Sequence, residues 1–456
     1  MTTRSPTLTK RDYVDLVHGE FTQTTPSDLR DAFEAFRSSG TNHLAVFFHG
    51  GLVSRTDGKA EAEQLIGGYR KAGTYPFFFI WNSDILTVLQ GLLFPFADNP
   101  VIRRVVERHI LFFCAALLQH LKFEDSHGRL LRAIADLARD ALPPPLTALA
   151  ALGRVVDSIW ARRRRDFALP PSPQSDKDIQ AFEQDVARDV AAFGGMLNKR
   201  TPFTPALGSD IVSRVWGRLR SGHDHGLYTT VIEEIAVAIR LHRFLARVWN
   251  RMKQDIDLAF QSDSARYGGT AFLEELVRVW KTDTRLTLIG HSAGTVYIDR
   301  MLNAIDQKLP DAIKADIVFI AAALSFDRFA ATIDTTVFRR RVTNYRLFAL
   351  KEECEAGYWE VPGVYDKSLL YLVSGLCEGD SEEDKPLVGM QRYWSGTAPY
   401  DTQPIRTVTA QIGSGARVWS PTDPNAPPGF RANARKHGCF ARERRTNGSV
   451  QEFLRQ

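Results

Sequence analysis

The chain has 456 residues, of which 44% are hydrophobic and 24% charged, a composition typical of a globular protein with a large core. Its 58 basic and 53 acidic side chains leave a formal net charge of +5, so we expect no dedicated nucleic-acid partner. The four cysteines are scattered without a Cys-x-x-Cys pair, which favours free thiols in a reducing compartment. Residues 1–16 lack the apolar stretch of a secretory signal, and no apolar run is long enough for a bilayer span. We therefore expect a cytoplasmic protein.

The first strands follow a polar N-terminal region. Within residues 1–40, only 29–36 has the apolar spacing of a short helix. His43 to Phe48 is a continuous apolar run, typical of a strand that is buried on both faces of a parallel sheet. Residues 59–72 then predict a helix and 75–81 the next strand. This order predicts a βαβ unit, with both strands ending at one edge of the sheet.

The loop after the first of these strands reads His49-Gly-Gly-Leu52. Glycines at such a position let backbone amides turn toward a substrate carbonyl. The tripeptide resembles the oxyanion-hole loop of α/β-hydrolases. We expect the backbone N–H of Gly51 or of Leu52 to be one donor to an oxyanion.

A long helical region interrupts the alternation of strand and helix. Residues 101–121 and 229–255 have helical periodicity, while Pro-rich stretches at 143–145 and 170–173 suggest linkers. We therefore expect a helical insertion at 85–262, acting as a cap or lid over the active-site edge.

Three features of the insertion have alternative interpretations. Leu86 to Phe96 is either a lid that gives peripheral membrane contact or a core helix of the insertion, which we favour. Arg162 to Arg165 suits anionic headgroups or nucleic acid, but a solvated helix end is the preferred interpretation. His223 to His225 is interpreted as a polar loop and not as a metal site, because no third ligand has a suitable spacing.

The segment that carries the chemistry lies after the insertion. Gly290-His-Ser-Ala-Gly294 fits the G-x-S-x-G pattern between an apolar strand and a helix. A serine on such a tight turn has a strained backbone and an accessible hydroxyl, which predicts that Ser292 is a nucleophile. The N–H of Ala293, at the helix start, is the other expected donor to the oxyanion, beside that of Gly51 or Leu52. The neighbouring predicted helices are 270–281, 295–302 and 449–454, and the predicted strands are 286–289, 316–321, 341–350 and 416–420.

The remaining catalytic partners are sought downstream of Ser292. His437 is the only histidine beyond the elbow itself, so it is the predicted general base. For the acid that orients it, we place Glu352 first, because it follows a predicted strand. The alternative acids are Glu353, Asp327 and, as the weakest candidate, Asp366.

Four downstream motifs carry a more specific similarity. They are Val364-Tyr-Asp-Lys-Ser-Leu-Leu-Tyr-Leu-Val-Ser374, Pro386-Leu-Val-Gly-Met390, Val418-Trp-Ser-Pro-Thr422 and His437-Gly-Cys-Phe440. Together they resemble a group of poorly characterised bacterial α/β-hydrolases, which have a Tyr-x-x-Ser-Leu-Leu-x-Leu-Val-Ser block and a His-Gly-Gly-Phe-like histidine loop. The resemblance covers 43–82 and 285–445. It implies that Glu352 stands where the group tends to have aspartate, and that Cys439 and Ala441 depart from its histidine loop.

The expected fold is an α/β-hydrolase fold, a mostly parallel sheet flanked by helices, with core segments 1–84 and 263–456 around the insertion. The expected function is a serine esterase or lipase acting on a small-molecule or lipid ester, with no metal or organic cofactor. An acyltransferase or amidase would use the same residues. An idle scaffold that binds a protein or a membrane is the alternative from another class.

Overall fold

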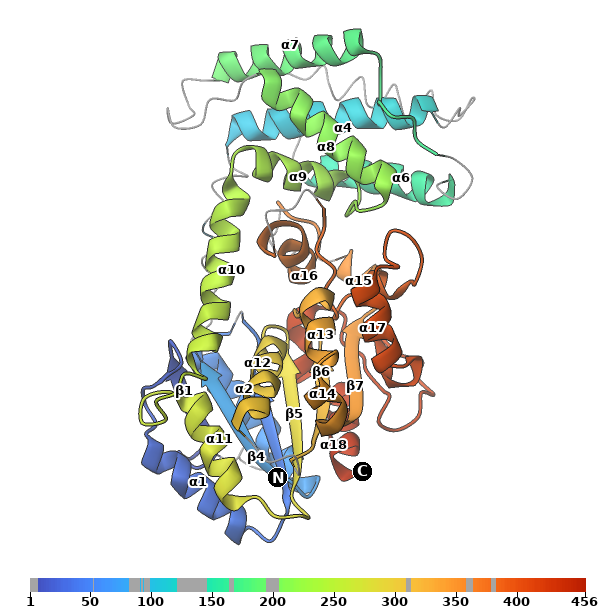
Figure 1. Cartoon of the computed structure of the whole chain (residues 1–456). Coiled ribbons are helices and arrows are strands. Elements are labelled where there is room, and N and C mark those ends of the chain that lie inside the picture. Colours follow the sequence, from blue (N-terminus) through green and yellow to red (C-terminus); the bar gives the residue numbers. More distant parts are fainter. Residues whose placement is uncertain are drawn as a thin grey trace, which may run out of the picture. The chain divides into compact units, whose positions relative to one another are not determined.

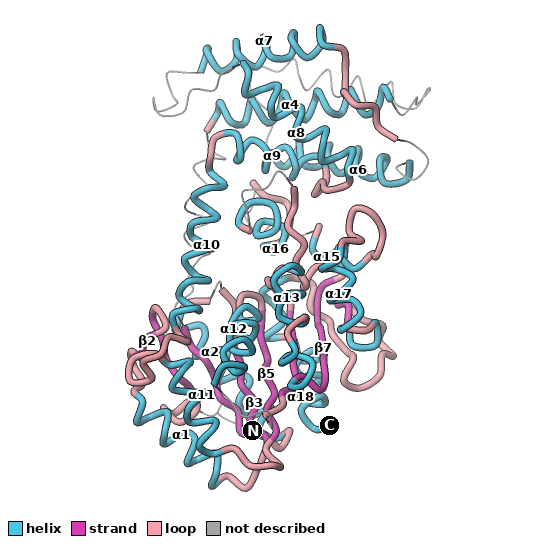
Figure 2. Tube along the Cα trace, viewed as in Figure 1, coloured by secondary structure: helices cyan, strands magenta, loops and turns pink. Residues whose placement is uncertain are grey.

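The computed structural model describes residues 7–51, 53–81, 91, 93, 99–120, 146–163, 168–193, 205–308, 313–357, 364–378 and 383–456. The chain divides into two compact units (Figures 1 and 2). Unit 1 comprises Met1–Thr87, Val248–Ala356 and Pro386–Gln456, and unit 2 comprises Val88–Arg247 and Gly357–Lys385. The boundary between the two units, after Arg247, falls within helix α10 (Leu241–Leu258). None of the described helices is long and apolar enough to cross a membrane.

Unit 1 is built on an eight-stranded sheet with the order β2-β1-β4-β3-β5-β6-β7-β8, drawn in magenta in Figure 2. Every neighbouring pair is parallel except the edge hairpin of β1 and β2. The strands are β1 (Tyr13–Val17), β2 (Glu20–Phe21), β3 (His43–Phe48), β4 (Tyr75–Trp81), β5 (Arg285–His291), β6 (Ala315–Ile320), β7 (Val342–Leu350) and β8 (Arg417–Ser420). The architecture is therefore α/β with a mostly parallel sheet.

Helices cover both faces of this sheet, because the central strands are continuously apolar and successive side chains point to opposite faces. On one face, Phe47 and Phe78 share a core with residues of α2 (Arg55–Lys71) and α18 (Arg444–Arg455). On the other face, Phe79 packs at ring-centroid distances of 5.2 and 5.5 Å against Phe272 and Tyr297. The helices that meet this second face include α1 (Pro26–Ser38), α11 (Gly268–Val279), α12 (Gly294–Lys308) and α13 (Phe326–Ile333), with α14 (Thr336–Arg341) following in the chain (Figure 1).

The strand register determines which loops meet. Phe48, the last residue of β3, lies opposite Gly290 of β5 and Phe79 of β4. The loop after β3 and the turn after β5 therefore leave the sheet side by side. The segments beyond β7 are short, with α15 (Glu352–Glu355), η2 (Gln391–Trp394), α17 (Gln403–Gln411), η3 (Ser414–Ala416) and η4 (His437–Arg442).

Unit 2 is helical in its described part. It contains α4 (Pro100–His120), α6 (Leu146–Arg163), α7 (Asp176–Phe193), α8 (Pro205–Ser221), α9 (Leu227–Ala238), α16 (Leu369–Leu372) and the π-helical turn η1 (Val373–Cys377). Its core includes the fully buried Phe113 and Trp216, whose rings stack. The last two elements come from Gly357–Lys385, which the sequence analysis assigned to the sheet core. Polar contacts explain the correction, since Tyr365 donates to Glu233 at 2.6 Å and Asp366 accepts from Thr229 at 2.6 Å.

Two further elements differ from the sequence predictions. The expected helix 229–255 is in fact two helices, α9 and α10, which separate at Arg240, a non-glycine residue with a φ of 64°. Strands β1 and β2 lie in the region expected to be mostly irregular. The predictions for Leu52, and for Leu86 to Phe96 apart from residues 91 and 93, concern residues outside the described ranges.

Candidate active site

Ser292 lies on a sharp turn between β5, which ends at His291, and α12, which begins at Gly294. Its φ of 51° is in the left-handed region, which is unfavourable for a residue with a Cβ atom. Neighbouring groups hold it there. Its N–H donates to the Ile320 carbonyl at 2.8 Å, and its carbonyl accepts from the Thr295 hydroxyl at 2.7 Å. The predicted strand–serine–helix turn is therefore present.

The glycines on both sides of Ser292 are required by close packing. A Cβ atom on Gly294 would lie 2.2 Å from the Phe48 carbonyl oxygen, and one on Gly290 would lie 2.9 Å from the backbone of Gly294. No side chain fits at such distances. The two glycines thus allow the turn to pack directly against the end of β3.

His437 meets Ser292 across the carboxyl edge of the sheet. Its Nε2 atom lies 2.9 Å from the Ser292 hydroxyl oxygen, and both residues are 2% exposed. Burial, followed by the neighbouring His291, lowers the pKa of His437 to about 3, so its imidazole is neutral near pH 7. A neutral Nε2 can accept the serine proton, which is the first requirement for a general base.

The loop that carries His437 is fixed at both ends. Before it, the Ser420 hydroxyl at the end of β8 donates to the Ala434 carbonyl at 2.6 Å. After it, the Glu443 carboxylate accepts from the backbone N–H groups of Asn433 at 2.9 Å and Thr446 at 2.8 Å, which also caps α18. The position of the imidazole is therefore built into the fold.

The predicted acid is not joined to this pair. Within the described ranges, the buried Nδ1 of His437 has no hydrogen-bond partner. Glu352 begins α15 directly after β7, and its backbone N–H donates to the Gln391 side chain at 2.8 Å. The alternatives Glu353 and Asp327 are exposed. Asp366, the weakest candidate, belongs to unit 2, where it pairs with Arg154 at 3.1 Å.

The predicted oxyanion loop lies beside the serine. A Cβ atom on Gly50 would lie 3.2 Å from the Ser292 Cβ, so the backbone of Gly50, which was not among the predicted donors, passes close to the serine. Gly51 follows it and is buried, whereas Leu52 is not among the described residues. Ala293 directly precedes α12, and backbone N–H groups at a helix start lack acceptors within the helix.

His49 fixes the start of this loop. Its Nε2 accepts from the Trp81 N–H at 3.1 Å, and its Nδ1–H donates to the Gly50 carbonyl at 2.9 Å. Burial lowers the pKa of His49 to about 4, which keeps it neutral. In the sequence, only the position of His49 just after a predicted strand drew attention to it. Nothing in the sequence predicted that its ring would hold the start of the loop.

Salt bridges anchor the helix that follows the loop. Asp15, fully buried on β1, pairs with Arg55 and, at 3.0 Å, with Lys59, both in the first turns of α2. The Ser54 hydroxyl caps the same helix by accepting from the Asp57 N–H at 3.1 Å. Strand β1, which lies between β2 and β4, thereby positions α2, the helix that follows the oxyanion loop.

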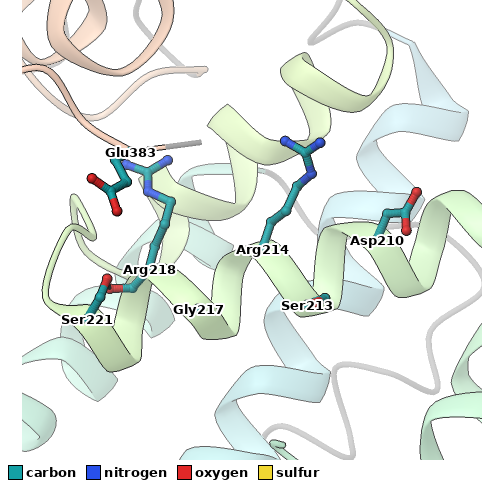
Figure 3. Close-up of a pocket in the computed structure, with 7 residues that line it drawn as sticks. All are labelled: Asp210, Ser213, Arg214, Gly217, Arg218, Ser221 and Glu383. Atoms are coloured by element: carbon teal, nitrogen blue, oxygen red, sulfur yellow. Dashed lines mark hydrogen bonds between the residues drawn. The ribbon is translucent and has the colours of Figure 1, made fainter. Parts of the chain in front are cut away.

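Unit 2 has a polar hollow with different chemistry. It has a volume of ≈ 450 Å³ and is lined by one stripe of α8 and by Glu383. Figure 3 shows Arg218 and Glu383 at one end and Asp210 at the other. Arg218 is paired with Glu233 at 2.8 Å and Glu234 at 2.9 Å. This hollow mixes both signs of charge, so it has no clear preference for a charged ligand.

The segment His223 to His225 of unit 2 bonds to the same group of buried charged residues as Arg218. His223 bonds to Asp384 at 2.7 Å and His225 to Glu233 at 2.8 Å. Burial raises the pKa of Glu233, but His225 and Arg218 outweigh it and lower the pKa to about 2. In the described part of the chain, no three His, Cys, Asp or Glu side chains are grouped to hold a metal ion.

Comparison with known proteins adds no assignment. No protein-family model, no curated protein and no solved structure matches this chain. The function must therefore be inferred from the chemistry of the site around Ser292.

Proposed function

We propose that this protein is a serine hydrolase of the α/β-hydrolase type that cleaves carboxylic esters through an acyl-enzyme intermediate on Ser292. One observation carries the proposal: a serine in a strained strand-to-helix turn has its hydroxyl 2.9 Å from the Nε2 of a buried, neutral histidine. A nucleophile within hydrogen-bond reach of a base is the arrangement that acyl transfer requires.

The order of the parts along the chain supports the same proposal. Ser292 follows β5, Glu352 follows β7 and His437 follows β8, while the glycine loop follows β3. In α/β-hydrolases, the nucleophile, acid and histidine occur in this order, and the second oxyanion donor comes from the loop after the third strand. A chance G-x-S-x-G pentapeptide would have no reason to coincide with these positions.

The reaction begins as the Ser292 oxygen bonds to the ester carbonyl carbon and its proton passes to His437 Nε2. The carbonyl π electrons move to the oxygen, where the N–H of Ala293 and an N–H of the Gly50–Leu52 loop stabilise the charge. His437 then gives its proton to the leaving alkoxide as the ester C–O bond breaks. Water attacks the acyl-enzyme, loses a proton to His437 and releases the acid, and the proton returns to Ser292.

Glu352 remains our proposal for the residue that orients His437. Catalytic hydrogen bonds are often long or poorly aligned in a ligand-free site and shorten when substrate binds. An imidazolium that forms in a buried site needs a compensating charge. The position of Glu352 immediately after β7 makes it the first carboxylate to test for this role.

Hydrolysis of p-nitrophenyl esters tests the proposal. The purified full chain should hydrolyse the esters, and Ser292→Ala and His437→Gln should each reduce kcat by about a thousandfold or more. The exposed Ser395→Ala is the matched serine control and should keep wild-type activity. Full activity in a folded Ser292→Ala protein would overturn the proposal.

The acyl chain is defined by the same assay. A series from acetate to long-chain esters, with and without vesicles, separates small-molecule esters from lipid esters. A rate that rises with chain length and with vesicles supports a lipid substrate at a membrane surface. An optimum at acetate without vesicle activation assigns the enzyme to small esters.

A further inference from the structure

His291, the residue before the proposed nucleophile, touches the proposed base in two ways. Its Nε2 lies 3.3 Å from the backbone carbonyl oxygen of His437. The two imidazole rings also stack, with centroids 5.4 Å apart and an angle of 28° between their planes. His291 therefore contacts both the backbone and the ring of His437.

The protonation state of His291 follows from these partners. A carbonyl oxygen only accepts hydrogen bonds, so Nε2 must carry the proton and Nδ1 the lone pair. Burial lowers the pKa of His291 to about 4, so the ring is neutral near pH 7. As a neutral donor, His291 can hold the His437 carbonyl without placing a second charge beside the base.

His291 also borders the oxyanion loop. It is 5% exposed, and its Nδ1 would lie 3.2 Å from a Cβ atom on Gly50. The buried Nδ1 has no hydrogen-bond partner among the residues that the structure describes. One side chain thus fills the space between the loop, the nucleophile turn and the base.

Among the described residues, few contacts hold the ring of His437 in place. Its ring is hydrogen-bonded to the Ser292 hydroxyl through Nε2, and within the described ranges Nδ1 has no hydrogen-bond partner. A base held only by its own nucleophile can rotate away from it, which weakens proton transfer. The contacts with His291 restrict this movement through ring stacking and through the hydrogen bond to the backbone.

We propose that His291 is a positioning residue, which holds His437 against Ser292 through the hydrogen bond to its carbonyl and through ring stacking. This inference rests on the proposed function, because it assigns His437 the role of base. We expect the position of His437 in the ligand-free site to depend more strongly on His291 than on Glu352.

Two substitutions separate the hydrogen bond from the ring. His291→Phe keeps a planar ring and removes the donor, whereas His291→Gln keeps a donor near the Nε2 position and removes the ring. The readout is the second-order rate of Ser292 labelling by a fluorophosphonate, measured from acid to neutral pH. Denaturant unfolding of each variant verifies that the fold is retained.

His291→Phe should slow labelling about fivefold to tenfold, the effect of one hydrogen bond, and His291→Gln should restore part of the rate. Glu352→Gln should slow it less than His291→Phe. Both His291 variants should also shift the acid limb of the pH profile upward, because removing the neighbouring imidazole raises the pKa of His437. A purely structural role would not give the partial rescue by glutamine.

A second readout does not depend on activity. The ¹⁵N shifts of the His437 ring should show one tautomer, with an unprotonated Nε2, in the wild type and mixed tautomers in His291→Phe. Unchanged shifts and wild-type labelling in both variants would overturn the positioning role. A wild-type protein that does not label would instead overturn the proposed function, and the ¹⁵N shifts would still decide whether His291 orients His437.

Discussion

The buried histidines of unit 1 predict a steep loss of stability at acid pH. Burial is the largest cause that lowers the pKa of His43, His49 and His291 to about 4 and that of His437 to about 3, from an ordinary value of 6.5. A group with a lowered pKa in the folded state stabilises the fold above its unfolded pKa, and this stability is lost as the pH falls toward the folded pKa. The window therefore runs from 6.5 down to about 4.

One carboxyl group acts in the opposite direction. Burial raises the pKa of Glu61 from 4.5 to about 8, so its contribution is present below 4.5 and is lost as the pH rises. Each group changes the slope of the unfolding free energy by about 1.4 kcal/mol per pH unit between its two pKa values. Four histidines opposed by one glutamate give a net slope of about 4 kcal/mol per pH unit near pH 5.5, as an order of magnitude.

Single substitutions test the contribution of each buried group to this slope. His437→Gln should make the slope shallower by about 1.4 kcal/mol per pH unit, and Glu61→Gln should make it steeper by a similar amount. The assay is urea unfolding between pH 5 and pH 6. Cleavage by a protease within β5 and β6 reports the unfolding of unit 1. Slopes that equal the wild-type slope in both variants would refute the assignment of buried neutral side chains.

Three further substitutions test packing and pairing within the two units, the first two in unit 1 and the third in unit 2. Gly294→Ala should destabilise unit 1 by about 1–3 kcal/mol in urea unfolding, because its Cβ would meet the Phe48 carbonyl at 2.2 Å; an unchanged midpoint would contradict this close approach. Asp15→Asn should lower stability by about 3–5 kcal/mol, since it leaves two cations of α2 without their buried partner, and thermal melts without a shift would count against it. Asp384→Asn should increase hydrogen exchange in residues 364–378, because the pairing with His223 is weakened; equal protection in mutant and wild type would argue against that contact.

Local sequence patterns predicted the parts of the fold that depend on local physics. The apolar runs of β3 and β4 are buried on both faces, so their hydrophobicity is continuous and easily recognised. The turn at Ser292 was also predictable, because strand, glycine, serine and helix follow one another within a few residues. The close approach of Gly294 to β3 explains the second glycine of the motif.

Other parts depend on contacts between distant segments. Strand β1 has an aspartate, Asp15, in its centre, and its burial is intelligible only once Arg55 and Lys59 are placed beside it. Similarly, Gly357–Lys385 joins the helical unit through partners more than a hundred positions away, such as Thr229 with Asp366. No periodicity within a short window contains this information.

The residues of the candidate site were likewise predictable from local motifs and chain order, but their contacts with distant segments were not. His437 was identified by its order in the chain, and the structure brings it to Ser292. The orienting carboxylate was not determined by sequence order, because several acids follow the relevant strands. His291 was visible inside the motif, but its contact with His437 depends on a loop 146 residues further along the chain.

The most direct test of the central claim is covalent labelling of the full chain with a fluorophosphonate, followed by intact-mass and peptide analysis. A single adduct on the peptide that contains Ser292 is expected, with no adduct in Ser292→Ala and much slower labelling in His437→Gln. No adduct on the folded wild-type protein, or equal labelling rates in the wild type and His437→Gln, would contradict the claim that His437 activates Ser292.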